Sequence, residues 1–206
     1  MSNKLQIYYF DMPFWRAEIS RIALHASGQP FDDVRLKRDD FRSLKASGAL
    51  PFGQVPVLKV NENFIAQTGA VARYCGRLAG LYPQEPLQQA QVDQVIDAMS
   101  DITMYIGRSM RIADAKTKKQ AREQLANETL PVWLGFLERL LNENGTGLFV
   151  GNQLTMADLA VWRTMGWLTG GILDGIPTNL LDQFQGLQKH VAFVESHSVV
   201  TSWKNR

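Results

Sequence analysis

The sequence predicts an α/β domain built on an open mixed sheet, followed by an all-helical domain. In the first part of the chain, short β-branched and aromatic runs alternate with amphipathic helix patterns in the order β-α-β-α-β-β-α. That order requires helices packed on the faces of the sheet. Strand signals then vanish, and apolar residues recur with helical spacing. One glycine and two prolines interrupt both patterns between these parts. We therefore predict a first domain over 1–79, a linker over 80–88 and a helical domain over 89–206.

The elements of the first domain follow from periodicity and from their boundary residues. Apolar positions such as Ile19 and Ile22 fall on one helical face, and Ser27-Gly28 ends that helix. Asp39 and Asp40 are typical residues for a helix start. The expected elements are a strand over 5–10, a helix from Arg16, a strand over 31–36, a short helix ending near Ser47, strands over 55–60 and 64–66, and a helix from Ala70.

The hairpin that ends this domain carries the first indication of a ligand. Pro56 stands at the entrance of a strand, where its missing N–H does no harm to the ladder. The sequence leaves the cis or trans state of the Val55-Pro56 bond open; if it is cis, the backbone of Val55 is turned outward as an edge to which an extended peptide could add. Gln67 or Thr68 would cap the next helix, whose free N–H groups suit a carboxylate. The site fits a small acidic peptide, and an ordinary hairpin leading into a helix is the alternative.

The second domain reads as a series of helices. Thr155-Met156-Ala157-Asp158 has the form of a capping box with Asp at its third helical position, which we interpret as structural. The helix that it opens is apolar on most faces and is expected at the centre of the domain. The predicted helices run over about 87–111, over 117–142 with a stop at Asn144-Gly145, from Thr155 through Met165, and in shorter segments after Asn179 and Gly186.

Composition excludes several classes of function. The chain has 206 residues, 45% of them hydrophobic, and a net charge of +2, as in ordinary soluble globular proteins. No apolar run approaches the ~18 residues of a membrane span, and no secretory leader pattern precedes the first strand. The basic residues are scattered apart from Lys116–Lys119, which is typical of a solvated helix face. We expect neither a membrane nor a nucleic acid as a partner.

Cofactor signals are also missing from the sequence. Cys75 is the only cysteine, so no internal disulfide is possible, a reducing compartment is favoured, and a buried inert thiol is expected. His25, His190 and His197 lie far apart without metal-ligand spacing. No glycine-rich phosphate-binding pattern occurs either. We therefore expect no metal and no nucleotide.

Four motifs together carry a resemblance to cytosolic glutathione transferases, most closely to the sigma class with its prostaglandin D synthases and lens S-crystallins. They match in order and spacing across nearly the whole chain. The motifs are Tyr9-Phe10-Asp11 with Arg16-Ala17-Glu18, Leu50-Pro51-Phe52-Gly53-Gln54-Val55-Pro56, Gln67-Thr68, and Gly151-Asn152-Gln153-Leu154-Thr155-Met156-Ala157-Asp158.

This resemblance implies a thioredoxin-like glutathione-binding domain, a helical domain that contributes the electrophile pocket, and a cytoplasmic homodimer that acts in detoxification. It implies glutathione as co-substrate. The backbone of Val55, in the Val55-Pro56 pair, would bind the cysteinyl unit. Gln67 and Thr68 would hold the γ-glutamyl carboxylate. The residues implied for the glycyl end are Phe41, Lys45 and Gln54. An acidic residue donated by the partner subunit maps to Asp101, for which a plain solvated position is the alternative.

The implied chemistry is stabilisation of the glutathione thiolate by Tyr9. Lowering a thiol pKa from about 8.5 by two units requires about 2.7 kcal/mol, and one charge-assisted hydrogen bond supplies about 1.5–3 kcal/mol. Arg16 would add positive potential. Neighbouring strand residues point to opposite faces, so only one of Tyr8 and Tyr9 can face the sulfur. The match to the family's Tyr-Phe-Asp motif selects Tyr9. Residues 11–16 contain neither Cys nor Ser, which disfavours thiol-disulfide exchange.

The electrophile pocket is expected to draw on the first strand-to-helix turn and on the first long helix of the second domain. The expected residues are Phe10, Met12, Phe14, Thr103, Met104 and Arg108. The turn before Arg16 is one residue longer than in the sigma pattern, and Ser100 and Arg108 depart from the prostaglandin synthases. Prostaglandin isomerisation and metal activation are therefore not implied. A non-catalytic, crystallin-like binding protein and a glutathione-dependent isomerase or peroxidase are the alternatives to a conjugating transferase.

Overall fold

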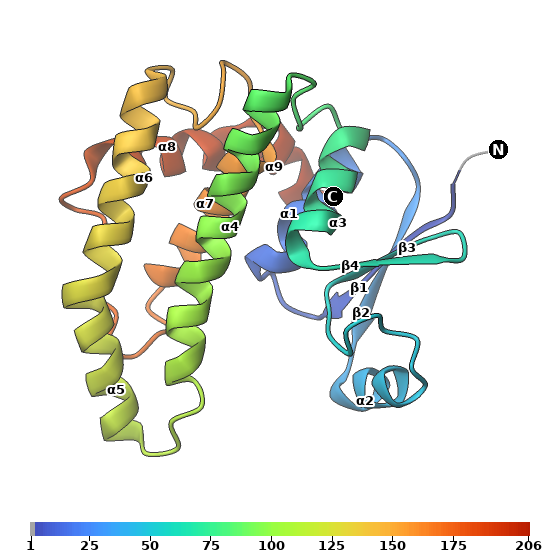
Figure 1. The fold of residues 1–206 in the computed structure, drawn as a ribbon, viewed down its shortest axis with the longest axis horizontal. Helices are drawn as coiled ribbons and strands as arrows, with labels where there is room; N and C mark the ends of the chain where they lie inside the picture. Colours follow the sequence, from blue (N-terminus) through green and yellow to red (C-terminus); the bar gives the residue numbers. More distant parts are fainter. Residues whose placement is uncertain (1–2) are drawn as a thin grey trace. The chain divides into compact units, whose positions relative to one another are not determined.

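The computed structural model describes residues 3–206, which form two compact units (Figure 1). The first unit comprises the chain up to Pro83 together with the C-terminal segment Ser198–Arg206. The second unit is Gln84–His197. No helix within the described residues is long and apolar enough to cross a membrane.

The first unit is built on a four-stranded mixed sheet. Its strands are β1 (Leu5–Phe10), β2 (Phe31–Leu36), β3 (Val57–Val60) and β4 (Asn63–Ala66), in the spatial order β2-β1-β3-β4. Strands β1 and β2 are parallel, whereas β3 is antiparallel to both of its neighbours. The predicted open mixed sheet is confirmed. β3 begins two residues later than expected, because Pro56 has no N–H to give to the ladder.

Helices cover both faces of this sheet. α1 (Trp15–Ala26) and α3 (Thr68–Leu78) pack against each other, and α9 (Ser198–Lys204) lies against α1 (Figure 1). The β1 residues Leu5, Ile7 and Tyr9 are buried. α2 (Arg38–Ala46) lies on the opposite side, where its Phe41 ring is 5.2 Å from the ring of Phe10.

The second unit contains only helices. They are α4 (Pro86–Ser109), α5 (Ala115–Gln124), the π-helical segment η1 (Leu125–Thr129), α6 (Leu130–Asn144), α7 (Met156–Leu168) and α8 (Gln185–Ser196). α7 packs against α4 and α8, and ten of its thirteen residues are buried, as predicted for the central helix. Gly145 ends α6 in the left-handed conformation, which glycine adopts at little cost.

α4 begins at Pro86, close to the expected start at about 87, and Pro86 takes an initial position that needs no N–H. Two sequence predictions for the helices were wrong. The single helix expected over 117–142 is interrupted by η1, which ends at Thr129, two residues before Pro131. Proline cannot donate the backbone bond to the carbonyl four residues earlier and its ring needs room there, and the wider π turn provides that room. The short helix expected directly after Asn179 does not form, because residues 179–184 form successive turns before α8 begins.

Candidate functional site

Five of the eight residues predicted to bind the peptide, together with Arg16, line a small cleft of the first unit. Phe41, Lys45, Asp101 and Tyr9 are not among its lining residues. Its cavity volume is about 20 Å³, so a peptide would lie along it and remain largely open to solvent. Six of its eight lining residues belong to the predicted site. The lining residues are Arg16, Phe52, Gln54, Val55, Pro56, Ala66, Gln67 and Thr68.

The backbone of Val55 forms an open edge of this cleft. The Val55-Pro56 peptide bond is cis, which resolves the alternative that the sequence left open. Neither the N–H nor the C=O of Val55 takes part in a hydrogen bond to any residue in the described range 3–206. Main-chain polar groups rarely stay without a partner, and such an edge suits an added peptide strand.

The start of α3 supplies a second unsatisfied backbone group. Gln67 occupies the N-cap position with φ 74°, and its side chain makes no capping hydrogen bond. The N–H groups of Thr68, Gly69 and Ala70 have no hydrogen-bond acceptor among residues 3–206. Free N–H groups at a helix start favour an anion. The prediction that Gln67 or Thr68 is the N-cap is confirmed for Gln67. Because its side chain makes no capping hydrogen bond, the N–H groups of the first turn are available to a carboxylate.

Arg16 adds a positive charge beside this helix start. Its Nη1 lies 3.5 Å from Thr68 Oγ1, which accepts the hydrogen bond. Burial lowers the pKa of Arg16, and the neighbouring Tyr9 opposes that shift. An arginine keeps its charge at neutral pH even when its pKa is lowered by burial, so the cleft carries positive potential.

Tyr9 points to the buried face of β1, and Tyr8 points to the other face. The Tyr9 side chain is 6% exposed, and burial raises its pKa, although the charges of Arg16 and Arg21 act to lower it. The phenol therefore stays protonated at neutral pH and can donate a hydrogen bond. Tyr8 donates to Gln6 Oε1 at 3.3 Å, and its ring lies 6.3 Å from that of Phe64.

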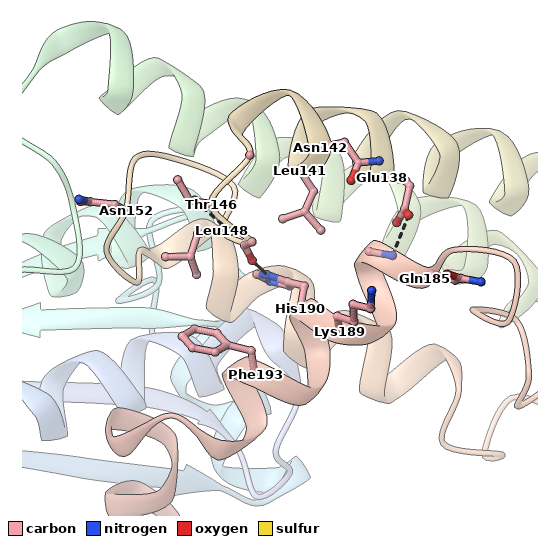
Figure 2. A pocket seen from close by; sticks show the side chains of 13 residues that line it. Glu138, Leu141, Asn142, Thr146, Leu148, Asn152, Gln185, Lys189, His190 and Phe193 are labelled. Carbon is pink, nitrogen blue, oxygen red and sulfur yellow. Dashed lines mark hydrogen bonds between the residues drawn. The ribbon is translucent and has the colours of Figure 1, made fainter.

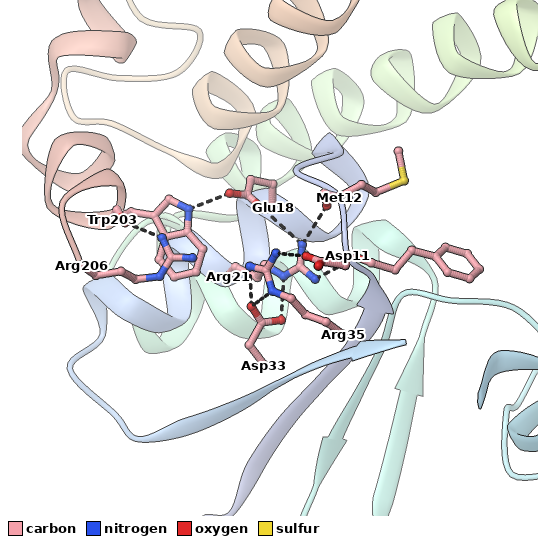
Figure 3. A network of polar contacts seen from close by, with 9 residues as sticks. Asp11, Met12, Glu18, Arg21, Asp33, Arg35, Trp203 and Arg206 are labelled. Carbon is pink, nitrogen blue, oxygen red and sulfur yellow. Dashed lines mark hydrogen bonds and ion pairs between the residues drawn. The ribbon is translucent and has the colours of Figure 1, made fainter. Parts of the chain in front are cut away.

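A polar network behind Tyr9 was not found by sequence reasoning (Figure 3). Its centre is Arg21 of α1, whose side chain has no exposed surface. Two carboxylates, Glu18 and Asp33, contact its guanidinium at 3.3 and 2.9 Å. The available signal was the presence of Glu18 and Arg21 among the apolar positions of a buried helix, since buried charges are rare unless they are paired.

The remaining predicted residues of the first unit lie on α2 and on the turn after β1. Lys45 is exposed, and its Cε lies 3.3 Å from where a Cβ of Gly53 would stand, so it runs beside the cleft loop. Phe41 and Phe10 are half-buried against each other. Met12 is 44% exposed, and Phe14 takes the N-cap position of α1.

The predicted residues of the second unit all lie on α4. Asp101 and Arg108 are exposed, and Met104 is 54% exposed. Thr103 is buried, and its hydroxyl donates to the carbonyl of Met99 at 2.7 Å. The guanidinium carbon of Arg108 lies 5.5 Å from the centre of the Tyr105 ring.

A larger cavity of about 650 Å³ lies within the helical unit (Figure 2). None of the predicted site residues lines it. Glu138 accepts hydrogen bonds at 2.7 Å from the N–H groups of Gly186 and Leu187 and so caps α8. His190 Nδ1 is 3.0 Å from the carbonyl of Gly147. These polar groups therefore hold the helix and the loop around the cavity.

The single thiol of the chain is inert. Cys75 is fully buried in α3, and burial raises its pKa to about 12. A thiol in that state is a poor nucleophile, in agreement with the prediction. Across the described residues, no three His, Cys, Asp or Glu side chains gather into a group able to hold a metal ion.

Comparison with known proteins gives concordant matches over almost the whole chain. Family models described as the glutathione S-transferase N-terminal and C-terminal domains match residues 5–77 and 100–206. Glutathione S-transferase 1 of Ascaris suum is 30% identical over 201 residues, which cover 96% of this chain and 94% of that protein.

Solved structures give the same result. A structure of prostaglandin synthase D of Nilaparvata lugens has a TM-score of 0.85 and 26% identity, with 98% of both chains covered. A monomeric glutathione S-transferase of Necator americanus has a TM-score of 0.80 and 28% identity, with 98% of this chain and 96% of that chain covered.

The mixed sheet with its unpaired Val55 edge, the helical unit that follows and the matching family models together define a class of glutathione-dependent enzymes. The chain belongs to the glutathione S-transferase family and is a transferase enzyme. The resemblance inferred from the four motifs is thus confirmed, and so is the predicted architecture of an α/β domain followed by a helical domain.

Proposed function

We propose that this transferase conjugates the thiolate of glutathione to small apolar electrophiles, with the Tyr9 hydroxyl donating a hydrogen bond to the sulfur. One observation carries the proposal: an unpaired backbone edge at Val55 and an uncapped start of α3 share a cleft with Arg16, which lies next to a protonated Tyr9. The edge suits the peptide, the helix start suits its carboxylate, and the phenol suits its sulfur.

Binding would use the cleft along its length. The N–H and C=O of Val55 would pair with the cysteinyl unit. The γ-glutamyl carboxylate would accept from the free N–H groups of α3, with help from Gln67 and Thr68. For the glycyl end we propose Phe41, Lys45 and Gln54. The partner subunit's Asp101 would complete the site if the protein is a dimer.

The reaction needs only a stabilised sulfur anion and a bound electrophile. The thiol of glutathione releases its proton to solvent, and the Tyr9 O–H stays protonated and stabilises the anion. With an aryl chloride, the sulfur forms a bond to the ring carbon and chloride leaves. A charge-assisted hydrogen bond of about 1.5–3 kcal/mol covers most of the required shift, so the mechanism that we propose uses no metal.

We propose electrophile contacts for three residues in each unit. In the first unit these are Phe10, Met12 and Phe14. On α4 they are Thr103, Met104 and Arg108. The partial exposure of Met12 and Met104 supports this choice, because methionine adapts to apolar ligands of varied shape.

Class, assembly and location are further parts of the proposal. The motifs and the prostaglandin synthase relative support a sigma-class detoxification enzyme. A cytoplasmic homodimer is the arrangement that the family resemblance favours. Because a related transferase is described as monomeric, sedimentation equilibrium of the purified protein is the measurement that decides, and a single species of about 23.2 kDa would refute the dimer.

The assignment of the phenol is tested by two matched substitutions. We expect Tyr9→Phe to lower kcat/KM for a chlorodinitrobenzene substrate by about 10- to 100-fold at neutral pH, the loss of one charge-assisted hydrogen bond. Glutathione affinity, measured by calorimetry, should change little. Tyr8→Phe is the control and should keep near wild-type activity. A large loss in Tyr8→Phe alone would refute the assignment, and an inactive wild type that binds glutathione would favour the non-catalytic alternative.

A further inference from the structure

We propose that Arg21 is a positioning residue that holds the turn after β1, and thereby aims the Tyr9 hydroxyl at the glutathione sulfur. This inference rests on the proposed role of Tyr9. It adds a component that is fixed by contacts inside the first unit alone.

Arg21 donates hydrogen bonds to the backbone immediately after Tyr9. Its Nη2 donates to the carbonyl of Phe10 at 3.3 Å, and its Nη1 donates to the carbonyl of Met12 at 3.0 Å. The N–H of Met12 also donates to the Phe10 carbonyl at 2.8 Å. A single planar guanidinium therefore binds two carbonyls of the turn that immediately follows the proposed catalytic residue.

Two carboxylates hold the guanidinium itself. Nε of Arg21 pairs with Asp33 of β2 at 2.9 Å, and Nη1 pairs with Glu18 at 3.3 Å (Figure 3). Because two carboxylates face one buried cation, the charge of Arg21 is compensated. The rigid fork of arginine suits four such contacts at once, which the single ammonium of lysine cannot reproduce.

Glu18 connects Arg21 to the C-terminal helix α9. Glu18 uses its other oxygen, Oε1, to accept a hydrogen bond from Trp203 Nε1 at 2.7 Å. Arg206 lies against the Trp203 ring (Figure 3). The chain of contacts thus runs from α9 through Glu18 and Arg21 to the turn after Tyr9, all within the first unit.

The Tyr9 phenol lies close to this guanidinium. The guanidinium carbon of Arg21 lies 5.9 Å from the centre of the Tyr9 ring. Since Phe10 follows Tyr9 directly, movement of the Phe10 carbonyl changes the direction of the neighbouring side chain. A misplacement of about 1 Å in a catalytic group costs as much as ~100-fold in rate, so a small loosening of this turn should be measurable.

The test is Arg21→Lys. This substitution keeps the positive charge between the two carboxylates but removes the planar guanidinium that binds the two backbone carbonyls. We expect the apparent pKa of the bound glutathione thiol to rise by about one unit. This pKa is obtained from the pH dependence of kcat/KM for the electrophile at saturating glutathione. The activity at about pH 5.5, below both pKa values, should then fall about tenfold, because in that range a thiol loses a factor of ten in thiolate for each unit. Glutathione affinity should stay within about twofold, since Val55 and the start of α3 are untouched.

Arg122→Lys is the matched control. Arg122 is also buried, and it donates to Ser109 Oγ and to the carbonyl of Asp174 in the helical unit. Its replacement by lysine also removes a buried guanidinium, but it leaves the turn after Tyr9 unchanged. It should lower the melting temperature and leave the pH profile unchanged.

Trp203→Phe gives a milder perturbation that keeps the test decisive if Arg21→Lys does not fold. It removes only the hydrogen bond to Glu18, and we expect the thiol pKa to rise by about half a unit, which lowers the activity at about pH 5.5 by about threefold. A folded Arg21→Lys variant, or failing that Trp203→Phe, with a wild-type pH profile would overturn the inference. That outcome is distinct from failure of the proposed function, in which Tyr9→Phe itself would leave the profile unchanged.

Discussion

Replacing Asp158 by alanine should strongly destabilise the helical unit. The carboxylate has no exposed surface. Its Oδ2 accepts from the N–H and the hydroxyl of Thr155 at 2.7 and 2.8 Å, and its Oδ1 accepts from the N–H of Phe149 at 2.9 Å. Asp158→Ala leaves these three buried donors without an acceptor. Each such loss costs about 1–3 kcal/mol, and because the rotatable hydroxyl can find another acceptor, we expect a total of about 3–5 kcal/mol.

Urea unfolding at neutral pH, followed by tryptophan fluorescence, measures this loss as a lower midpoint at constant slope. Asp114→Ala is the control, because Asp114, the N-cap of α5, also accepts a hydrogen bond from a backbone N–H at a helix start, that of Thr117, but is fully exposed. The Asp114 variant should lose much less stability. A loss below about 1 kcal/mol for Asp158→Ala would refute the reasoning, since it would mean that the three donors are satisfied without the carboxylate.

Two further predictions concern the cleft and the thiol. Thr68→Val removes the hydroxyl that accepts from Arg16, and should weaken glutathione binding in calorimetry by about fivefold, as expected for one hydrogen bond; unchanged affinity would remove Thr68 from the site. Because burial raises the pKa of Cys75 to about 12, the native thiol should resist iodoacetamide at mildly alkaline pH, and rapid labelling would contradict its burial. The unfolded thiol ionises at lower pH than the native one, so the free energy of unfolding should fall as the pH rises from about 9 towards 12.

The sheet and the opposite orientation of Tyr8 and Tyr9 on β1 could be predicted because local patterns determine them. The alternation of β1 puts Leu5, Ile7 and Tyr9 on one face, and period two follows from strand geometry alone. The cleft could also be predicted, since Val55-Pro56 and Gln67-Thr68 are short contiguous motifs that line it.

The network around Arg21 could not be predicted, because its partners come from distant positions in the chain. Asp33 lies on β2 and Trp203 on the C-terminal helix, and no periodicity connects them with Arg21. The π segment Leu125–Thr129 was missed for another reason. A one-residue widening of a helix scarcely changes the spacing of apolar residues, so the pattern over 117–142 reads as a continuous helix.

The central claim is that the Tyr9 hydroxyl keeps the sulfur of bound glutathione anionic, and spectroscopic titration of the thiolate band tests it most directly. The bound thiol in the wild-type protein should ionise about two units below the usual value of about 8.5, and in Tyr9→Phe it should return close to that value. Equal ionisation of the bound thiol in both proteins would contradict the account.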